Sequence, residues 1–277
     1  MREMKKYVIS LAILATLLTS CASEFNRVYK TTDNDYKYEF AKECFARGKF
    51  TQAITLLQEL VTIQKGTDNA QECLYMLAMA EYCDRDYESA SETFKKYYQT
   101  YPKGIYAEQA AFYIGQSLYQ STPEPRLDQT ATVNAISAYQ DFLDFFPESQ
   151  LKAKASSRMF ELTDKLVLKE YLSAKLYYNL GDYFGNCTNG GSNFEACIVT
   201  SENALKTYPF TTMREQFAVL IMKSKYELAR QSVEEKKIER YRDAEDECYG
   251  FINEYPESVE RKTAERYIKK CKEITKD

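Results

Sequence analysis

The chain has 277 residues and a formal net charge of −4, which is the wrong sign for a protein that binds nucleic acid through a basic surface. It contains no His and no Trp, but 24 Tyr and 15 Phe. Without His, the commonest proton shuttle and metal ligand is missing, and Ser-His and Cys-His nucleophile pairs are excluded. We therefore expect that the chain is not an enzyme and holds neither a metal ion nor a cofactor, apart from a covalent lipid discussed below.

The first twenty residues are typical of a secretory signal. Arg2, Lys5 and Lys6 precede an apolar run that extends from Tyr7 to Ser20. A helix rising about 1.5 Å per residue would cover about 21 Å over this run, which is short of the ~30 Å hydrocarbon core of a bilayer. The pattern therefore predicts a cleaved signal peptide over residues 1–20 and not a membrane span.

The apolar run stops at Cys21, within the stretch LTSC, which resembles the lipobox of bacterial lipoproteins. The resemblance implies cleavage before Cys21 and lipidation of its thiol and its new amino group, because two acyl chains anchor a protein stably where one does not. Residues 21–33 would then be a lipidated tether, and the lipid would be the only contact with the membrane. A plain signal peptide with an incidental cysteine is the alternative.

Four later segments end in an aromatic residue followed by proline: YPKG at 101, FPES at 146, YPFT at 208 and YPES at 255. Proline cannot continue a helix and biases its predecessor away from helical angles, so each segment predicts a helix end. In three of them a small residue and two larger ones precede the proline with spacings of 4, 3 and 5, namely Ala90, Phe94, Tyr97 and Pro102; Ala135, Tyr139, Phe142 and Pro147; and Ala244, Cys248, Phe251 and Pro256.

Each of these helices has an expected partner upstream, marked by the large-small pairs at 40–41, 77–78 and 114–115. A helix, a turn, a second helix and a proline, repeated at about 34 to 37 residues, resemble the tetratricopeptide repeat. We predict an all-α solenoid of five such helix pairs, closed by a capping helix at about residues 258–275. Three insertions, QSTPEPRLDQT, FGNCTNGGSNF and QSVEEKKIER, predict extended loops or lengthened helix ends.

Aromatic residues on the first helices of repeats 1–3 define a candidate peptide-binding groove. In each repeat two rings stand seven residues apart, so both project from one helix face. Rings give contact area at low entropic cost, which suits peptide binding, although packing between repeats is the alternative. The candidate groove residues are Tyr38, Lys42, Phe45, Tyr75, Met79, Tyr82, Phe112, Gln116 and Tyr119.

Of the eight cysteines, seven remain after Cys21 is used, and an extracytoplasmic location permits disulfides. Cys187 and Cys197 flank the stretch TNGGSNFEA and are the candidate disulfide pair. The other cysteines fall on helical patterns, where we expect buried thiols that act as small hydrophobic groups. The carboxylates of Asp84 and Asp86 lie in an inter-helix turn, where helix capping explains them.

The lipobox, the five repeat units and the aromatic-proline ends together resemble the BamD family of outer-membrane β-barrel assembly lipoproteins. The segments that carry the resemblance are GKFTQAITLLQEL, DYESASETFKKYYQTYPKG, AISAYQDFLDFFPES, ELTDKLVLKEYLSAKLYYNLGDY and ERYRDAEDECYGFINEYPES.

This resemblance implies a non-enzymatic subunit of the barrel assembly machinery, lipid-anchored on the periplasmic side of the outer membrane. Its partners would be a BamA-like barrel subunit and unfolded outer-membrane protein precursors. Residues 34–149 (repeats 1–3) would form the client groove, and residues 150–277 (repeats 4–5 and the capping helix) would dock the partner. The competing class is an adaptor lipoprotein with the same repeats that serves cell-wall, pilus or protease machinery.

Overall fold

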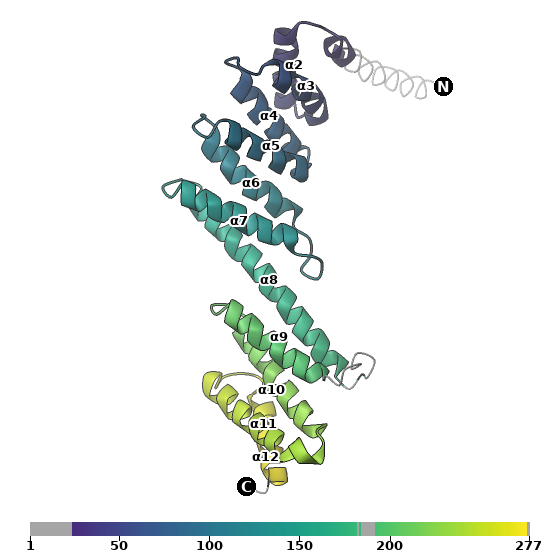
Figure 1. Cartoon of the computed structure of the whole chain (residues 1–277), viewed down its shortest axis with the longest axis vertical. Helices are drawn as coiled ribbons and strands as arrows, with labels where there is room; N and C mark the ends of the chain where they lie inside the picture. The colour runs from purple at the N-terminus through teal and green to yellow at the C-terminus, as the bar shows by residue number, and fades with distance from the viewer. Residues whose placement is uncertain (1–23, 182, 184–191, 276–277) are drawn as a thin grey trace, which may run out of the picture. The chain divides into compact units, whose positions relative to one another are not determined.

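The computed structural model of the chain describes residues 24–181, 183 and 192–275. Every regular element in these ranges is a helix (Figure 1): α2 (Asn34–Ala46), α3 (Phe50–Ile63), α4 (Ala70–Cys83), α5 (Tyr87–Thr100), α6 (Ala107–Ser121), α7 (Thr130–Phe145), α8 (Lys152–Leu180), α9 (Asn193–Thr207), α10 (Arg214–Arg230), α11 (Glu234–Glu254) and α12 (Arg261–Thr275). The predicted lipidation site Cys21 and the predicted disulfide partner Cys187 lie outside the described residues.

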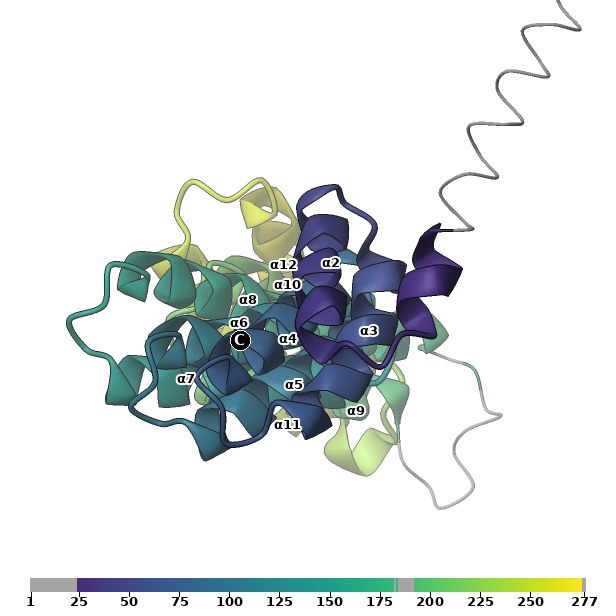
Figure 2. The ribbon, with the colours of Figure 1, turned by 90° about the horizontal axis from the view of Figure 1, so that it is seen from above.

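The predicted all-α repeat fold is confirmed. Helices α2 to α11 form five successive pairs, and α12 follows as the expected closing helix. Within these pairs each helix packs against the next one along the chain, as the ribbons show from the side and from above (Figures 1 and 2).

The predicted helix ends at the aromatic-proline motifs are also confirmed. Tyr101, Tyr208 and Tyr255 each follow the last helical residue and have φ values of −130°, −123° and −127°, the extended range that a following proline favours. Each of these tyrosines still donates its backbone N–H to the carbonyl four residues earlier, and Phe146 does the same after α7. The motif therefore ends each helix without leaving this N–H unpaired.

Small residues set the close approach of neighbouring helices. At Gly115 on α6, an added Cβ would lie only 2.9 Å from the ring of Tyr139 on α7. The equivalent positions of the first two repeats, Ala41 and Ala78, are fully buried. Glycine replaces alanine in the third repeat because the tyrosine ring occupies the space of the methyl group.

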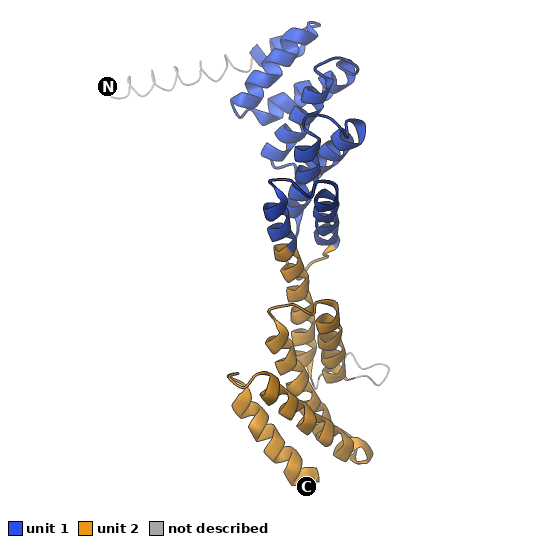
Figure 3. Cartoon of the chain, turned by 90° about the vertical axis from the view of Figure 1, so that its left-hand side faces the viewer, with its two compact units in different colours: residues 1–123, 130–159 blue, residues 124–129, 160–277 orange. Residues whose placement is uncertain are grey.

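The chain divides into two compact units, which Figure 3 colours separately. Unit 1 comprises residues 1–123 and 130–159, and unit 2 comprises residues 124–129 and 160–277. The division falls within α8, so this helix contributes residues to both units.

The segment expected as a tether is partly folded. Residues 24–29 are helical, and Val28 is fully buried in the same hydrophobic cluster as Tyr38 and Leu57 of the first repeat, with Phe25 packed against it. From Phe25 onward, this segment is therefore part of unit 1 and not a free tether.

The insertions take both of the predicted forms. The first is an extended loop between α6 and α7, whereas most of the third is the first turns of α11, which begins at Glu234. Most of the second lies outside the described residues.

Candidate functional site

The predicted groove rings form two rows: Tyr38, Tyr75 and Phe112 are the first row, and Phe45, Tyr82 and Tyr119 are the second row. The first row lies mostly in the interior of unit 1. The side chains of Tyr38 and Phe112 are only 2% and 1% exposed. The ring of Phe112 contacts the rings of Phe142 and Tyr139 on α7, with centroids 5.5 and 5.8 Å apart. The prediction that Tyr38 and Phe112 line a groove is therefore wrong, because packing within the repeats takes up their surface.

Tyr75, the middle member of that row, is half-buried in a cluster of rings. It stacks on Tyr106 at 4.4 Å and meets Phe94 and Tyr97 edge-on, both at 5.8 Å. Burial, followed by the neighbouring tyrosines, raises the pKa of the Tyr75 phenol. Such contacts are typical of a packed aromatic core.

Lys42, Met79 and Gln116, which lie between the two rows, already contact other residues of unit 1. Gln116 is buried and accepts a hydrogen bond from the Tyr139 hydroxyl at 3.0 Å, so its place in the groove is also a wrong prediction. Lys42 is half-buried and forms an ion pair with Glu39 at 2.6 Å. Met79 is half-buried against the ring cluster around Phe94.

The second row keeps part of its surface. Phe45 contacts Phe50 of the following helix at 5.7 Å, and Tyr82 contacts Tyr87 of the following helix at 5.4 Å. All three rings of the row are only partly exposed. These rings lie near the C-terminal ends of α2, α4 and α6, and part of each ring stays accessible to solvent.

Tyr119, the third ring of this row, is held by the first residues of α8. The Arg158 guanidinium lies 4.4 Å from its ring centroid, and the Arg158 Nη1 donates to the Tyr119 hydroxyl at 2.8 Å. A stacked guanidinium that also donates a hydrogen bond fixes the ring in place.

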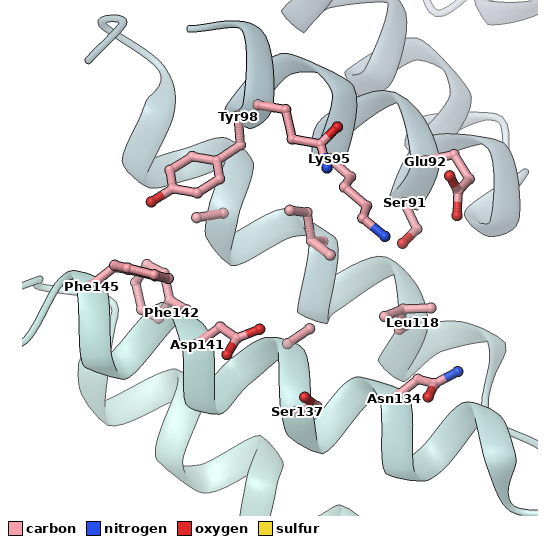
Figure 4. A pocket seen from close by; sticks show the side chains of 14 residues that line it. Ser91, Glu92, Lys95, Tyr98, Leu118, Asn134, Ser137, Asp141, Phe142 and Phe145 are labelled. Carbon is pink, nitrogen blue, oxygen red and sulfur yellow. The ribbon is translucent and has the colours of Figure 1, made fainter. Parts of the chain in front are cut away.

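A different hollow of unit 1 offers the open surface that the predicted rows lack. It has a volume of about 540 Å³ and lies between α5, α6 and α7 (Figure 4). We call it the α5–α7 groove, and its lining residues are Ser91, Glu92, Lys95, Tyr98 and Gln99 of α5, Ala111, Ile114 and Leu118 of α6, and Asn134, Ser137, Ala138, Asp141, Phe142 and Phe145 of α7.

The α5–α7 groove has an apolar floor between two polar walls. Ala111, Ile114 and Leu118 recur at helical spacing along one face of α6 and form the floor. Lys95 of α5 and Asp141 of α7 extend toward the space from opposite sides (Figure 4). Walls of this kind can hydrogen-bond a peptide backbone while the floor holds apolar side chains.

Aromatic residues close one end of the groove. Phe145 is 65% exposed although it is a large ring, and its centroid lies 6.2 Å from that of Tyr98. Phe145 also lines a second hollow of about 820 Å³, beside Pro147 and Lys154. An exposed ring that lines two hollows can pack against an apolar side chain of a binding partner.

None of the nine predicted groove residues lines the α5–α7 groove. The apolar spacing of Ala111, Ile114 and Leu118 is the sequence signal for this groove, but the sequence analysis used residues 114–115 only as the mark of a first helix. Which face of α6 stays open depends on how α5 and α7 pack on it, and the spacing alone does not contain that information.

The remaining candidate residues have structural roles. Asp86 caps α5, since its Oδ1 accepts the Ser89 N–H at 3.2 Å, which confirms the capping interpretation for this residue. The Asp84 carboxylate instead accepts a hydrogen bond from the Thr51 hydroxyl of α3 at 3.4 Å. Cys197 is a fully buried thiol on α9, and because Cys187 lies outside the described residues its disulfide with Cys197 stays a prediction. Over the described ranges, no cluster of three or more Cys, Asp or Glu side chains could hold a metal ion. In the same part of the chain, no helix combines the length and apolarity needed to cross a membrane.

Comparison with known proteins identifies the family. The sequence pattern of the YfiO family, described as "Outer membrane lipoprotein", matches residues 30–189, which is more than half of the chain. The outer membrane protein assembly factor BamD of Caulobacter vibrioides is 22% identical over 177 residues, which are 62% of this chain and 58% of the relative. The protein provisionally named outer membrane protein assembly factor BamD of Aquifex aeolicus is 26% identical over 136 residues, which are 49% of this chain and 43% of the relative.

Among solved structures, the TPR2AB domain of yeast Sti1 in complex with pHSP90 covers 88% of this chain with a TM-score of 0.42 and 16% identity. The match covers 84% of that structure, but the likeness is too low to support an argument about function.

The described residues thus define a helical-repeat protein whose surface suits binding. The chain belongs to the YfiO (BamD) family of outer membrane lipoproteins. This family consists of non-enzymatic assembly factors, so the chain is not an enzyme. It spans about half the length of the curated relatives that it matches.

Proposed function

We propose that this chain is a non-enzymatic lipoprotein subunit of the machinery that folds and inserts β-barrel proteins in the outer membrane. The observation that carries the proposal is its membership of the YfiO family over residues 30–189. Both curated relatives bear the name of an outer membrane protein assembly factor, which supports the same role here.

In this proposal unit 1 receives unfolded barrel precursors, and the α5–α7 groove is the receiving surface. A barrel strand alternates apolar and polar side chains and, before it pairs, presents free backbone donors and acceptors. Its apolar side chains would pack on Ile114, Leu118 and Phe145, while Gln99 and Asn134 would meet its backbone. The groove is open and its walls are polar, so binding would be weak enough to release the precursor.

Residues 150–277 would dock a BamA-like barrel subunit. The charged stretch 234–247 of α11 is partly engaged within unit 2: Lys237 pairs with Glu234 at 2.9 Å, and Glu247 pairs with Lys225 of α10 at 2.6 Å. Partly exposed ion pairs of this kind contribute little to stability and can be exchanged for a partner's charges.

A lipid on Cys21 would hold the chain on the periplasmic side of the outer membrane. Replacement by Cys21→Ser should leave the helical circular dichroism spectrum unchanged and release the chain from the membrane fraction. Retention of the variant in that fraction would contradict the lipid anchor.

The experiment that tests the function combines purification with depletion. A tagged full-length chain, extracted from its own cells in detergent, should bring down a barrel protein that carries periplasmic repeats. Depletion of the chain should lower many outer-membrane barrel proteins at once. A cell-wall or pilus defect with unchanged barrel proteins would contradict the proposal and favour the adaptor class.

A further inference from the structure

The insertion between α6 and α7 is an ordered loop with a defined shape. The Leu127 N–H donates to the Glu124 carbonyl at 3.0 Å. The buried Gln129 side chain donates its Nε2 to the carbonyls of Glu124 and Leu127 at 2.8 and 3.1 Å. The two prolines of the loop restrict its backbone further. These contacts give Arg126, near the middle of the loop, a fixed position.

Residues 124–129 of this loop belong to unit 2, where Arg126 and α8 line a hollow of about 400 Å³. The hollow contains three cations, Arg126, Lys169 and Lys175, beside the apolar side chains of Leu172 and Leu176. We call it the basic hollow.

The sequence of α8 separates this hollow from the interior of unit 2. Val167 and Ala174 are buried in the cluster that α8 forms with α9 and α10, and Tyr171 packs against the same cluster. Leu172 and Leu176 stand on the opposite side of the helix at a spacing of four residues. Leu176 is 57% exposed, so the hollow-facing side of α8 is unusually apolar for a solvent face.

The charges of the basic hollow are not balanced within the described part of the chain. Among the described residues, no carboxylate lines the hollow, and no carboxylate forms an ion pair with Arg126, Lys169 or Lys175. The carboxylate of the neighbouring Glu170 acts on Tyr208, the residue after α9, where burial and then this carboxylate raise the pKa of the phenol. In a chain with a net charge of −4, three unbalanced cations create a local positive field that attracts anions.

We propose that the basic hollow binds an acidic segment of a protein partner. A Glu or Asp carboxylate of the partner enters between Arg126, Lys169 and Lys175, where a guanidinium can bind it in bidentate fashion. An apolar side chain next to that carboxylate packs on Leu172 and Leu176.

Three features favour an acidic peptide as the occupant. Charge complementarity requires an anion. A free phosphate would leave the exposed Leu176 and the partly exposed Leu172 uncovered. A concave site suits a protruding side chain better than a flat lipid surface. The α8 residues of the hollow fall within the range 150–277 proposed above for docking, so this inference rests on that proposed role and names the chemistry of one contact. The peptide test below does not depend on which protein carries the acidic segment, so it can fail while the docking role stands.

The test uses a short fluorescent peptide of alternating Glu and Leu and the full-length chain. Fluorescence anisotropy should detect binding that weakens with salt, because ion pairing drives it. The triple variant Arg126→Gln, Lys169→Gln, Lys175→Gln should bind about threefold or more weakly, since three weak, partly exposed ion pairs are lost together. A carbodiimide should also join the peptide to Lys169 or Lys175 in the unaltered chain.

The matched control removes the same charge elsewhere in unit 2. Lys262→Gln, Lys269→Gln and Lys270→Gln on exposed positions of α12 should leave the affinity for the peptide unchanged. Equal losses in the two triple variants would overturn the proposal, because binding would then follow net charge alone. The proposal would equally be overturned if inorganic phosphate displaced the peptide more effectively than sodium chloride at the same ionic strength, or if phosphatidylglycerol vesicles bound the hollow and the peptide did not.

Discussion

Units 1 and 2 use the same repeat position in different ways. In the second helix of a pair, the position four residues after Ala90, Ala135, Cys197 or Ala244 is fully buried in both units. This position holds Phe94 or Tyr139 in unit 1 but Ser201 or Cys248 in unit 2. The cluster around Cys248 contains Tyr226 of α10 and Tyr267 of α12, stacked at 3.8 Å, together with Tyr241 and Phe251 of α11 itself. The repeat therefore determines which position is buried, but the size of the side chain at that position differs from one helix pair to the next.

The two units also differ in how charge links their helices. In unit 2, Lys223 of α10 meets Glu260 at 2.8 Å and Lys225 meets Glu247 of α11 at 2.6 Å. In unit 1 the Lys37–Glu59 pair at 3.0 Å joins the two helices of the first repeat, but the second and third repeats are joined by rings, such as Tyr75 on Tyr106 at 4.4 Å. Ring contacts are insensitive to pH and salt, whereas partly exposed ion pairs are sensitive to both. We expect the two units to respond differently to the same perturbations.

The largest expected difference comes from truncating the equivalent buried positions. Tyr139→Ala should lower the free energy of unfolding by about 3–5 kcal/mol, because it leaves a ring-sized cavity and an unpaired Gln116. Cys248→Ala should cost only roughly 1 kcal/mol, since it removes a single sulfur atom. Urea unfolding of both variants measures this contrast. Equal losses would mean that the units do not differ in how this position is filled.

A smaller effect is expected from Glu81, a buried carboxyl of unit 1. Burial, opposed by a hydrogen bond to Thr93, raises the pKa of Glu81 above its ordinary value. A raised folded-state pKa favours the protonated form, so its contribution to stability is present at low pH and is lost as pH rises through that pKa.

Glu81→Gln should therefore stabilise the chain at neutral pH by about 1 kcal/mol and flatten its pH dependence above the ordinary pKa of a glutamate. Urea midpoints measured across the pH range test this, with the exposed Glu88→Gln as the matched control. A destabilised Glu81→Gln protein at neutral pH would contradict the assignment.

The smallest expected effect concerns the Lys223–Glu260 pair of unit 2. The hydrogen bond from Lys223 lowers the pKa of the Glu260 carboxyl. The stability from this pair is present above the ordinary pKa of a glutamate and is lost as pH falls through the lowered one. Glu260→Gln should cost up to about 1 kcal/mol at neutral pH, and less in high salt. A loss that does not change with salt would argue against an ion pair.

Much of the fold could be predicted from the sequence because its signals are local. The aromatic-proline ends act through backbone sterics, and the structure ends α5, α7, α9 and α11 at these motifs. The small-large pattern at Gly115 and Tyr139 likewise encodes a close helix contact. These features require no knowledge of distant parts of the chain.

The candidate site was less predictable because exposure depends on neighbours. Tyr38 and Phe112 share a helix face with partly exposed rings, yet the packed repeats bury them. The α5–α7 groove draws on three helices, and the basic hollow combines a loop with α8. Helical periodicity describes one helix at a time, so it cannot identify surfaces that several elements build together.

The central claim, that the α5–α7 groove receives barrel precursors, is tested most directly by site-specific photocrosslinking in cells. A photoreactive residue at Ser137 would stand in the groove, whereas one at Gln140 would stand on an exposed part of the same helix outside it. We predict that the Ser137 probe traps unfolded outer-membrane barrel proteins and that the Gln140 probe does not. Trapping at both positions, or of no barrel protein at Ser137, would contradict the claim.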